Sequence, residues 1–348
     1  MGDLAGNKLF TLVRDFFKSY LPNMRKCSPN TIRAYQKALE LLFDFVKSEK
    51  HVKLNEITFQ MIDSAMLEKF LDHVENERGC SVATRNHRLQ CIRAFYTYVA
   101  ETEATAVAYW QELKKVKSAI APKETVEHMS ETAVTAVLEQ PDTSTQKGLR
   151  DMFMMLFLYQ TGARVQELLD VRLCDIRWGS TPTVTLHGKG GKVRAVPLRE
   201  KAVEHLKKYI AAFHPNQGKY SEQHLIYVIR DGVKKRMTED NVRRLVCDYG
   251  ITARKVCPEV PENVHPHLFR HSRAMHLYQS GVDLMLVSQW LGHSKLDTTL
   301  IYAHADTELK RQAIANAIPE DSPLSEYLNA ERYKVDDEDL LKQLCGLK

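Results

Sequence analysis

The sequence predicts a mainly α-helical protein of two domains, the second of which contains a small β-sheet. Three observations support this fold class. The chain has 348 residues, which at roughly 150 residues a domain is more than one ordinary core accommodates. Apolar residues recur at helical spacing along much of it, for example Ile32, Tyr35 and Leu39. Two short strand-like segments, 183–187 and 192–198, flank a turn that contains three glycines.

The first hundred or so residues predict a bundle of four or five helices. Apolar stripes with a spacing of three to four residues run through residues 9–20, 32–46, 58–74 and 81–99. Ser28 followed by Pro29 marks the start of the second helix, because serine caps a helix and proline fits its first turn.

Basic side chains lie near the starts of these helices, where unpaired backbone N–H groups also attract phosphate. The candidate phosphate contacts are Arg33, Lys37, Arg85, Arg88 and Arg93. A charged helix face is usually only solvated, so on this feature alone both interpretations remain open.

A basic stretch around Pro122 predicts the connection between the domains. We expect a helical domain over residues 1–112, a linker over 113–128, a second domain over 129–320 and a tail over 321–348. In the second domain we expect helices over 130–140, 146–160, 200–213 and 238–255, and a strand over 225–229. From Pro266 onward the pattern is helical again, with breaks at Gly281 and Gly292.

Composition narrows the class of protein. The net charge of +5 leans towards polyanionic partners without identifying one. We expect a cytoplasmic protein with free thiols and no membrane contact, because there is no leader-like start, no run of 18 apolar residues and no C-x-x-C among seven cysteines. No phosphate-binding P-loop and no dinucleotide-binding glycine motif is present, so ATP and NAD chemistry are not indicated.

Four short stretches contain candidate catalytic residues. They are TGARVQEL at 161–168, HGKGGK at 187–192, HLFRH at 267–271, and LGHS at 291–294, followed by Tyr302. In this order they resemble the tyrosine recombinase, or phage integrase, family, including integrases of transposons and integrative conjugative elements and Xer-like recombinases. The resemblance implies the catalytic set Arg164, Lys189, His267, Arg270, His293 and Tyr302.

The resemblance also implies a fold and a DNA partner. The first domain would be the helical, SAM-like core-binding domain of the family. The second would be its mixed α/β catalytic domain, and the two would close around duplex DNA as a clamp. The basic residues of the first domain, together with Lys192 in the second, would then contact the DNA backbone.

The chemistry of phosphodiester cleavage fits these residue types. An arginine fork matches two phosphate oxygens, which suits Arg164 and Arg270. The phenol of Tyr302, with an ordinary pKa of about 10, needs a proton acceptor before it attacks. By resemblance, His267 moves that proton, Lys189 protonates the departing 5′ oxygen and His293 donates a hydrogen bond to the phosphate.

Two further residues are given supporting roles, Glu167 beside the arginines and His271 within the fold. Taken singly, members of the set also fit simpler roles: Tyr302 alone would be a packing tyrosine, and Arg164 would only pair with Glu167. A zinc site at His265, His267 and His271 is disfavoured, since no fourth ligand has a convincing spacing.

By resemblance, the reaction is site-specific recombination through a 3′-phosphotyrosyl intermediate and a Holliday junction, without a cofactor. The expected partners are inverted-repeat core sites in double-stranded DNA, three further copies of the chain and an accessory excision factor, and the expected role is moving a mobile element. No additional arm-binding domain is expected before the core-binding helices.

Alternatives remain open at this point: Xer-like chromosome or plasmid dimer resolution, a type IB topoisomerase, and a non-catalytic DNA-binding regulator. The tail would pack either on a neighbouring protomer or on its own domain.

Overall fold

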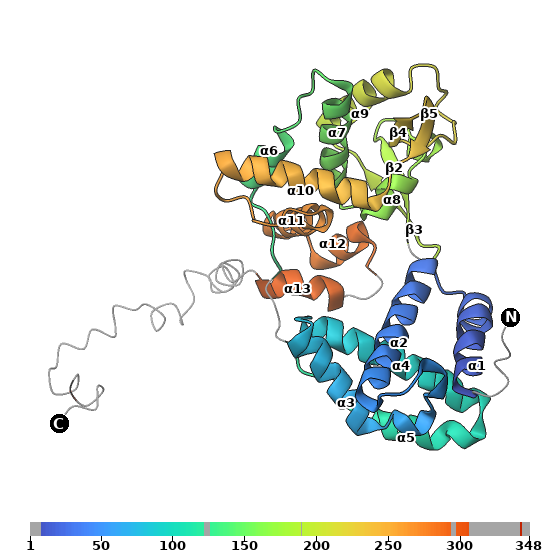
Figure 1. The fold of residues 1–348 in the computed structure, drawn as a ribbon. Helices are drawn as coiled ribbons and strands as arrows, with labels where there is room; N and C mark the ends of the chain where they lie inside the picture. The colour runs from blue at the N-terminus through green and yellow to red at the C-terminus, as the bar shows by residue number, and fades with distance from the viewer. Residues whose placement is uncertain (1–7, 122–125, 189, 294–296, 306–341, 343–348) are drawn as a thin grey trace, which may run out of the picture. The chain divides into compact units, whose positions relative to one another are not determined.

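The computed structural model describes residues 8–121, 126–188, 190–293, 297–305 and 342 (Figure 1). The chain divides into two compact units, residues 1–123 and 124–348. Lys189 and all of the 321–348 tail except Lys342 lie outside the described residues. Helices dominate both units, and the described strands lie in the second, so the predicted fold class is confirmed.

The first unit is a helical bundle. Its elements are α1 (Lys8–Asp15), η1 (Phe16–Met24), α2 (Pro29–Lys50), η2 (Leu54–Glu56), η3 (Phe59–Met61), α3 (Ser64–Asp72), η4 (His73–Glu77), α4 (Val82–Thr102), η5 (Ala104–Ala106) and α5 (Val107–Lys114). The predicted helix start at Ser28 is confirmed, since its side chain accepts the Thr31 N–H at 3.3 Å. Ser81 caps α4 in the same way, through the N–H of Thr84.

Two predicted helices of this unit differ from the structure. The 58–74 helix begins only at Ser64, because the Asp63 carboxylate accepts the Met66 N–H at 2.8 Å and caps the chain there. The helix over 9–20 changes at Phe16 into a wider π-helical segment that contains Pro22. Helical spacing of apolar residues shows neither change.

Two candidate phosphate contacts, Arg85 and Arg93, bind groups within this unit. Arg85 is only 9% exposed, and its Nε lies 3.1 Å from a carboxylate oxygen of Glu75. Arg93 donates to the Val116 carbonyl beyond the end of α5. Leu113 and Val116 are buried in the same core, so the first unit continues past residue 112.

The second unit places helices around two small antiparallel sheets. Its elements are α6 (Glu131–Leu138), α7 (Gln146–Thr161), α8 (Val165–Asp170), η6 (Leu173–Asp175), β1 (Ile176–Arg177), β2 (Thr183–His187), β3 (Val193–Pro197), α9 (Glu200–Phe213), β4 (Tyr227–Arg230), β5 (Val233–Arg236), α10 (Glu239–Val256), α11 (Pro266–Gln279), α12 (Leu284–Leu291) and α13 (Asp297–Ala305).

The predicted hairpin is confirmed, with β2 and β3 paired from Thr183 opposite Pro197 to His187 opposite Val193. β1 adds an edge strand to make the order β1-β2-β3. The strand expected over 225–229 is β4, and it pairs with β5 across a turn at Asp231 and Gly232, both with positive φ. The predicted elements do not include β1 and β5.

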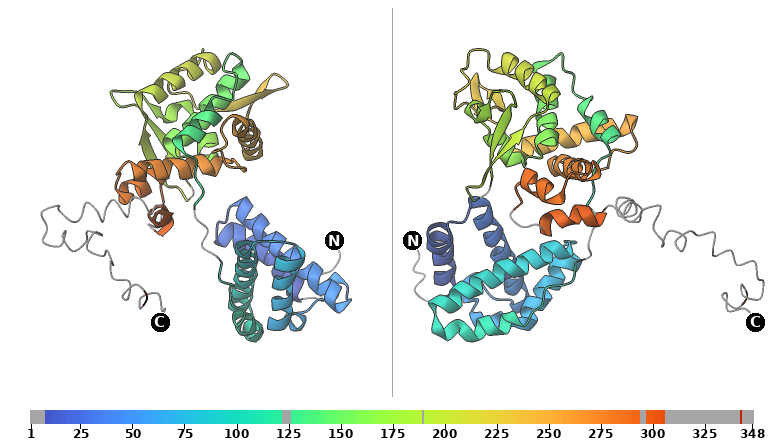
Figure 2. Two further views of the ribbon diagram at one scale, coloured as in Figure 1. Left: turned by 90° about the vertical axis from the view of Figure 1, so that its left-hand side faces the viewer. Right: turned by 180° about the vertical axis from the view of Figure 1, so that it is seen from behind.

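Helix α11 contacts α7, α10, α12 and α13. Figures 1 and 2 show these helices within the second unit. Pro266 occupies its first turn, and glycines at 281 and 292 follow the ends of α11 and α12 as expected. This arrangement brings motifs from distant parts of the sequence to one place. Among the described helices, none is long and apolar enough to cross a membrane.

Candidate active site

Arg164 follows a tight helix ending. Helix α7 stops at Gly162, which adopts a left-handed conformation with φ of 61°. A Cβ at that position would lie 2.9 Å from Cδ2 of Leu291, so a larger residue would be both strained and crowded. Arg164 then precedes the first turn of α8. The sharp ending of α7 therefore sets where Arg164 lies.

Glu167 is hydrogen-bonded to both the backbone and the side chain of Arg164. Its carboxylate accepts the Arg164 backbone N–H at 2.8 Å and a guanidinium N–H of the same residue at 2.9 Å. Both carboxylate oxygens also accept from Arg194, at 3.0 and 2.8 Å. Burial alone would raise the pKa of Glu167, which is 3% exposed, but the hydrogen bonds from Arg194 and Arg164 outweigh it and lower the pKa to about 2. The carboxylate is therefore ionised at neutral pH.

Arg194 was not among the residues predicted from the sequence. It lies on β3, and besides Glu167 its Nε donates to the Trp290 carbonyl at 2.9 Å. The sequence does hold a signal, because strand alternation places Arg194 on the same face as the buried Val196. An arginine on the inward face of a strand needs an internal partner.

Arg270 joins the ends of two helices. Its guanidinium donates to the Gly162 carbonyl at 2.5 Å and to the Leu291 carbonyl at 2.6 Å, at the C-terminal ends of α7 and α12. The side chain is 3% exposed. Burial, and then the charges of Arg164 and Arg194, lower its pKa to about 9. It remains a cation at neutral pH, held where helix dipoles favour positive charge.

Tyr302 lies within a small apolar cluster formed by α11, α12 and α13. It is 1% exposed, and its hydroxyl is hydrogen-bonded to Nδ1 of His271 at 2.9 Å. Burial raises its pKa to about 12, and the nearby charges of Arg270 and Arg164 offset only part of that rise. The phenol is therefore protonated in the chain without a substrate.

His267, His271 and His293 are neutral at pH 7. Burial, followed by neighbouring cationic groups, lowers the pKa of His271 and of His293 to about 4. Burial and the Arg270 charge also lower the pKa of His267. Nδ1 of His293 is hydrogen-bonded to the fully buried Thr299 of α13 at 2.7 Å. Neutral imidazoles accept and donate protons, which suits acid–base chemistry.

Two hollows of about 570 Å³ each meet at Arg164. One is lined by Arg164 and His267, together with Val165, Gln166, Glu239, Asp240, Arg243, Asn263, His265 and Pro266. The other is lined by Arg164, Glu167, Lys192, Arg194 and His293, together with Gly188, Val193, Gln289 and Gly292. The structure therefore gathers Arg164, His267, Arg270, His293 and Tyr302, while Lys189 lies outside the described residues.

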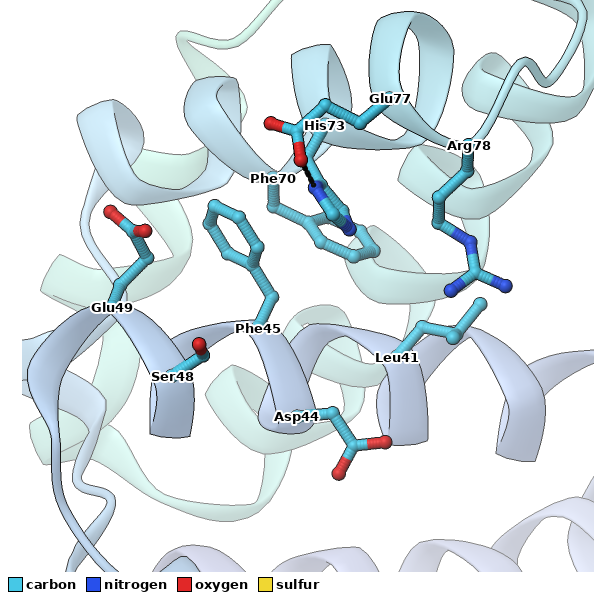
Figure 3. Close-up of a pocket in the computed structure, with 9 residues that line it drawn as sticks. All are labelled: Leu41, Asp44, Phe45, Ser48, Glu49, Phe70, His73, Glu77 and Arg78. Atoms are coloured by element: carbon cyan, nitrogen blue, oxygen red, sulfur yellow. Dashed lines mark ion pairs between the residues drawn. The ribbon is translucent and has the colours of Figure 1, made fainter.

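A further cavity of about 290 Å³ lies in the first unit, between α2 and the α3–η4 segment. Figure 3 shows the ring of His73 beside those of Phe45 and Phe70. Nδ1 of His73 forms an ion pair with Glu77 at 2.8 Å. Among the described residues that line this cavity, none belongs to the predicted site.

The remaining candidate phosphate contacts are accessible to different extents. Arg33 and Lys37 on α2 are exposed; Arg33 donates to Asn30 and Lys37 forms an ion pair with Glu40 at 2.9 Å, both on the same helix. Arg88 on α4 is half-buried and reaches the Ala34 carbonyl at 3.5 Å. Within the described part of the chain, no cluster of three or more His, Cys, Asp or Glu residues could hold a metal ion.

The sequence matches known proteins over both units. Residues 127–308 match the Phage integrase family, and residues 15–103 match its N-terminal SAM-like domain. The chain is 30% identical to the integrase/recombinase y4rC of Sinorhizobium fredii over 89% of its own length and 92% of that protein. It is 29% identical to the tyrosine recombinase XerD of Staphylococcus epidermidis, over 84% and 94% respectively.

Solved structures show the same fold. The XerH recombinase in a post-cleavage complex with a palindromic difH substrate aligns with a TM-score of 0.66 at 22% identity, covering 90% of each chain. The Tn1549 transposon integrase in complex with circular intermediate DNA aligns with a TM-score of 0.63 at 17% identity, covering 87% of this chain and 98% of that one. The chain thus belongs to the phage integrase family of tyrosine recombinases, enzymes that break and rejoin DNA.

Proposed function

We propose that this protein is a site-specific recombinase that exchanges strands between two DNA sites through a tyrosine-linked intermediate. The observation that carries the proposal is that Arg164, His267 and His293 line two adjoining hollows. The charges of Arg164 and Arg270 also act on the Tyr302 phenol. Two guanidinium groups supply positive charge where phosphate oxygens gain negative charge during attack. Family membership supports the same chemistry.

In the proposed reaction, the Tyr302 hydroxyl oxygen attacks the scissile phosphorus while Arg164 and Arg270 hold its non-bridging oxygens. The phenol proton passes to His267, which lines the same hollow as Arg164. The bond from phosphorus to the 5′ oxygen breaks, and Lys189 gives that oxygen its proton. The product is a 3′-phosphotyrosyl bond and a free 5′ hydroxyl, which preserves the phosphodiester energy without a cofactor.

His293 is proposed to donate a hydrogen bond to the scissile phosphate. Its Nδ1 is hydrogen-bonded to the Thr299 hydroxyl. When Nδ1 of the neutral ring accepts the hydroxyl hydrogen, the ring hydrogen is on Nε2. With the Thr299 hydroxyl as the donor in this pair, Nε2 of His293 can donate to the phosphate.

His271 is proposed to hold Tyr302 before the substrate arrives. Its ring contacts the phenol directly, whereas His267 is more exposed and faces the hollow beside Arg164. The phenol must leave His271 for the phosphate when DNA binds.

The proposed partner is double-stranded DNA with inverted-repeat core sites. Four copies of the chain would bind two such sites and exchange their strands through a Holliday junction. Arg33, Lys37 and Arg88 of the first unit and Lys192 beside Arg164 are the proposed backbone contacts. We propose integration or excision of a mobile element, aided by an excision factor. One of the similar solved structures is a transposon integrase bound to circular intermediate DNA, which supports this choice.

The test uses duplexes tiled across the DNA that flanks the gene, each containing a nick that traps the covalent product. The wild-type protein should form a protein–DNA adduct resistant to denaturant with one sequence, and should join strands between two copies of it. Tyr302→Phe is the matched control, and it should bind that duplex but form no adduct. Relaxation of supercoils regardless of sequence would instead identify a topoisomerase, and binding without any adduct a regulator.

A further inference from the structure

The Arg194 side chain donates three hydrogen bonds to two other residues. Its two terminal nitrogens donate to both oxygens of Glu167, at 3.0 and 2.8 Å, and its Nε donates to the Trp290 carbonyl at 2.9 Å. The side chain is 13% exposed. The proposed reaction assigns no role to this partly buried cation.

These bonds join three segments of the site. Glu167 lies in the first turn of α8, directly behind Arg164, and Trp290 lies in the last turn of α12, three residues before His293. The Trp290 carbonyl belongs to a helix end, where carbonyls lack partners within the helix. Arg194 itself lies on β3, the strand that follows the 188–192 turn. One planar fork therefore fixes the spacing of Arg164, His293 and the hairpin.

Glycines keep the space around this fork open. A Cβ on Gly292 would lie 3.0 Å from a terminal nitrogen of Arg194 and 3.1 Å from its Cδ. A Cβ on Gly188 would lie 3.2 Å from Oε1 of Glu167. The backbones of the hairpin and of the α12 ending thus lie close against the Arg194–Glu167 pair, and a shift of the pair would be transmitted to both.

We infer that Arg194 is a positioning residue for DNA cleavage, which acts through Glu167 to hold the Arg164 guanidinium in register with His293. The inference rests on the proposed function. In this role Arg194 acts on Glu167 and not on the phosphate. A lysine at position 194 would keep the charge beside Glu167 but could not satisfy both carboxylate oxygens and the Trp290 carbonyl in one plane.

The test measures the single-turnover rate of adduct formation on the trapped duplex. Arg194→Lys should slow the rate about 10- to 100-fold, as expected for a small displacement of a catalytic group, while the dissociation constant for uncleaved DNA stays unchanged. Arg236→Met is the matched control, because Arg236 pairs at 2.6 Å with Asp170 at the other end of α8. This control should cleave at the wild-type rate.

Two measurements distinguish a positioning role of Arg194 from a general destabilisation of the fold. In an Arg164→Lys background, Arg194→Lys should add little further loss, because both changes act on one group. On a duplex with an uncharged methylphosphonate at the scissile position, the deficit of Arg194→Lys should shrink, since that linkage needs less positive charge from Arg164. Equal deficits on both linkages, or additive losses, would overturn the inference.

The wild-type protein separates failure of the inference from failure of the proposed function. If it forms no adduct with any flanking duplex, the proposed function is wrong and this inference is overturned with it. If the wild-type protein forms an adduct and Arg194→Lys forms it equally fast, only the inference is wrong.

Discussion

The Nδ1 atom of His271 lies 2.9 Å from the hydroxyl of Tyr302, so the proposed nucleophile is already paired within the substrate-free chain. The pair lies in an apolar cluster that raises the pKa of the phenol to about 12. An unpaired, ionised phenol would be costly to bury there. Burial therefore keeps Tyr302 neutral, and the hydrogen bond to His271 holds its hydroxyl in place until the substrate phosphate binds.

The two neighbouring histidines of α11 should have different effects on cleavage. His267→Ala should slow adduct formation about 100-fold or more, because His267 lines the hollow beside Arg164 and is the proposed proton acceptor. His271→Ala should slow it less than about tenfold, because His271 is proposed only to hold the resting phenol. Single-turnover rates of the two variants on the same duplex check this, and a reversed order would assign the proton to His271.

Replacing Arg164 by lysine should slow cleavage about 10²- to 10³-fold, because lysine keeps the charge but loses the fork that matches two phosphate oxygens. DNA affinity should change little, since the proposed contacts to the DNA backbone are other cations. Rates of adduct formation and binding isotherms for uncleaved duplex separate the two effects. A variant that cleaves at the normal rate would remove Arg164 from the proposed catalytic set.

The free energy of unfolding should fall as the pH drops from about 6.5 towards 4. In that window the unfolded chain protonates His271 and His293, whose ordinary pKa is 6.5, while burial keeps both neutral in the folded state down to about pH 4. Since the unfolded state binds more protons, acid favours it, by up to about 1.4 kcal/mol per pH unit for each histidine. Above pH 6.5 the contribution is fully present.

Urea titrations at several pH values check that prediction. The double variant His271→Asn/His293→Asn should show a shallower loss of stability over the same window. Identical slopes in the variant and the wild-type protein would contradict the assigned histidines.

Gly162→Ala should destabilise the second unit by more than about 1–2 kcal/mol. That amount is the usual cost of a left-handed conformation, and the new methyl would also crowd Leu291 at 2.9 Å. Gly281→Ala is the control for conformation alone, because its φ is 80° and nothing lies within 4 Å of the added Cβ. Urea unfolding of both variants gives the comparison, and equal losses would show that crowding at Gly162 is unimportant.

The sequence was sufficient for the parts of the molecule that depend on local pattern. Helix starts at Ser28 and Pro266, the β2–β3 hairpin and the breaks at Gly281 and Gly292 follow from capping, alternation and turn chemistry. The order of the motifs was enough to suggest the family, because that resemblance depends on residue identity and spacing alone.

The remainder depends on contacts between distant residues. Arg85 and Arg93 look like surface cations in a helical pattern, yet Glu75 and the Val116 carbonyl bind them within the first unit. Strand alternation places Arg194 on the inward face of β3, but it does not identify Glu167, 27 residues away, as the group that accepts from it. Helical or strand spacing shows which side chains face inward, and not which distant residues they contact.

The contacts of Arg270 matter for the design of a variant that binds DNA without cutting it. If the guanidinium were removed, the carbonyls of Gly162 and Leu291 would both lose their buried donor. The variant would therefore be destabilised at the ends of α7 and α12 as well as losing a catalytic group. Tyr302→Phe deletes one hydroxyl, which is hydrogen-bonded to Nδ1 of His271. A non-cutting decoy should therefore be built at position 302, and inactivity after replacement of Arg270 should not be interpreted as a purely catalytic defect.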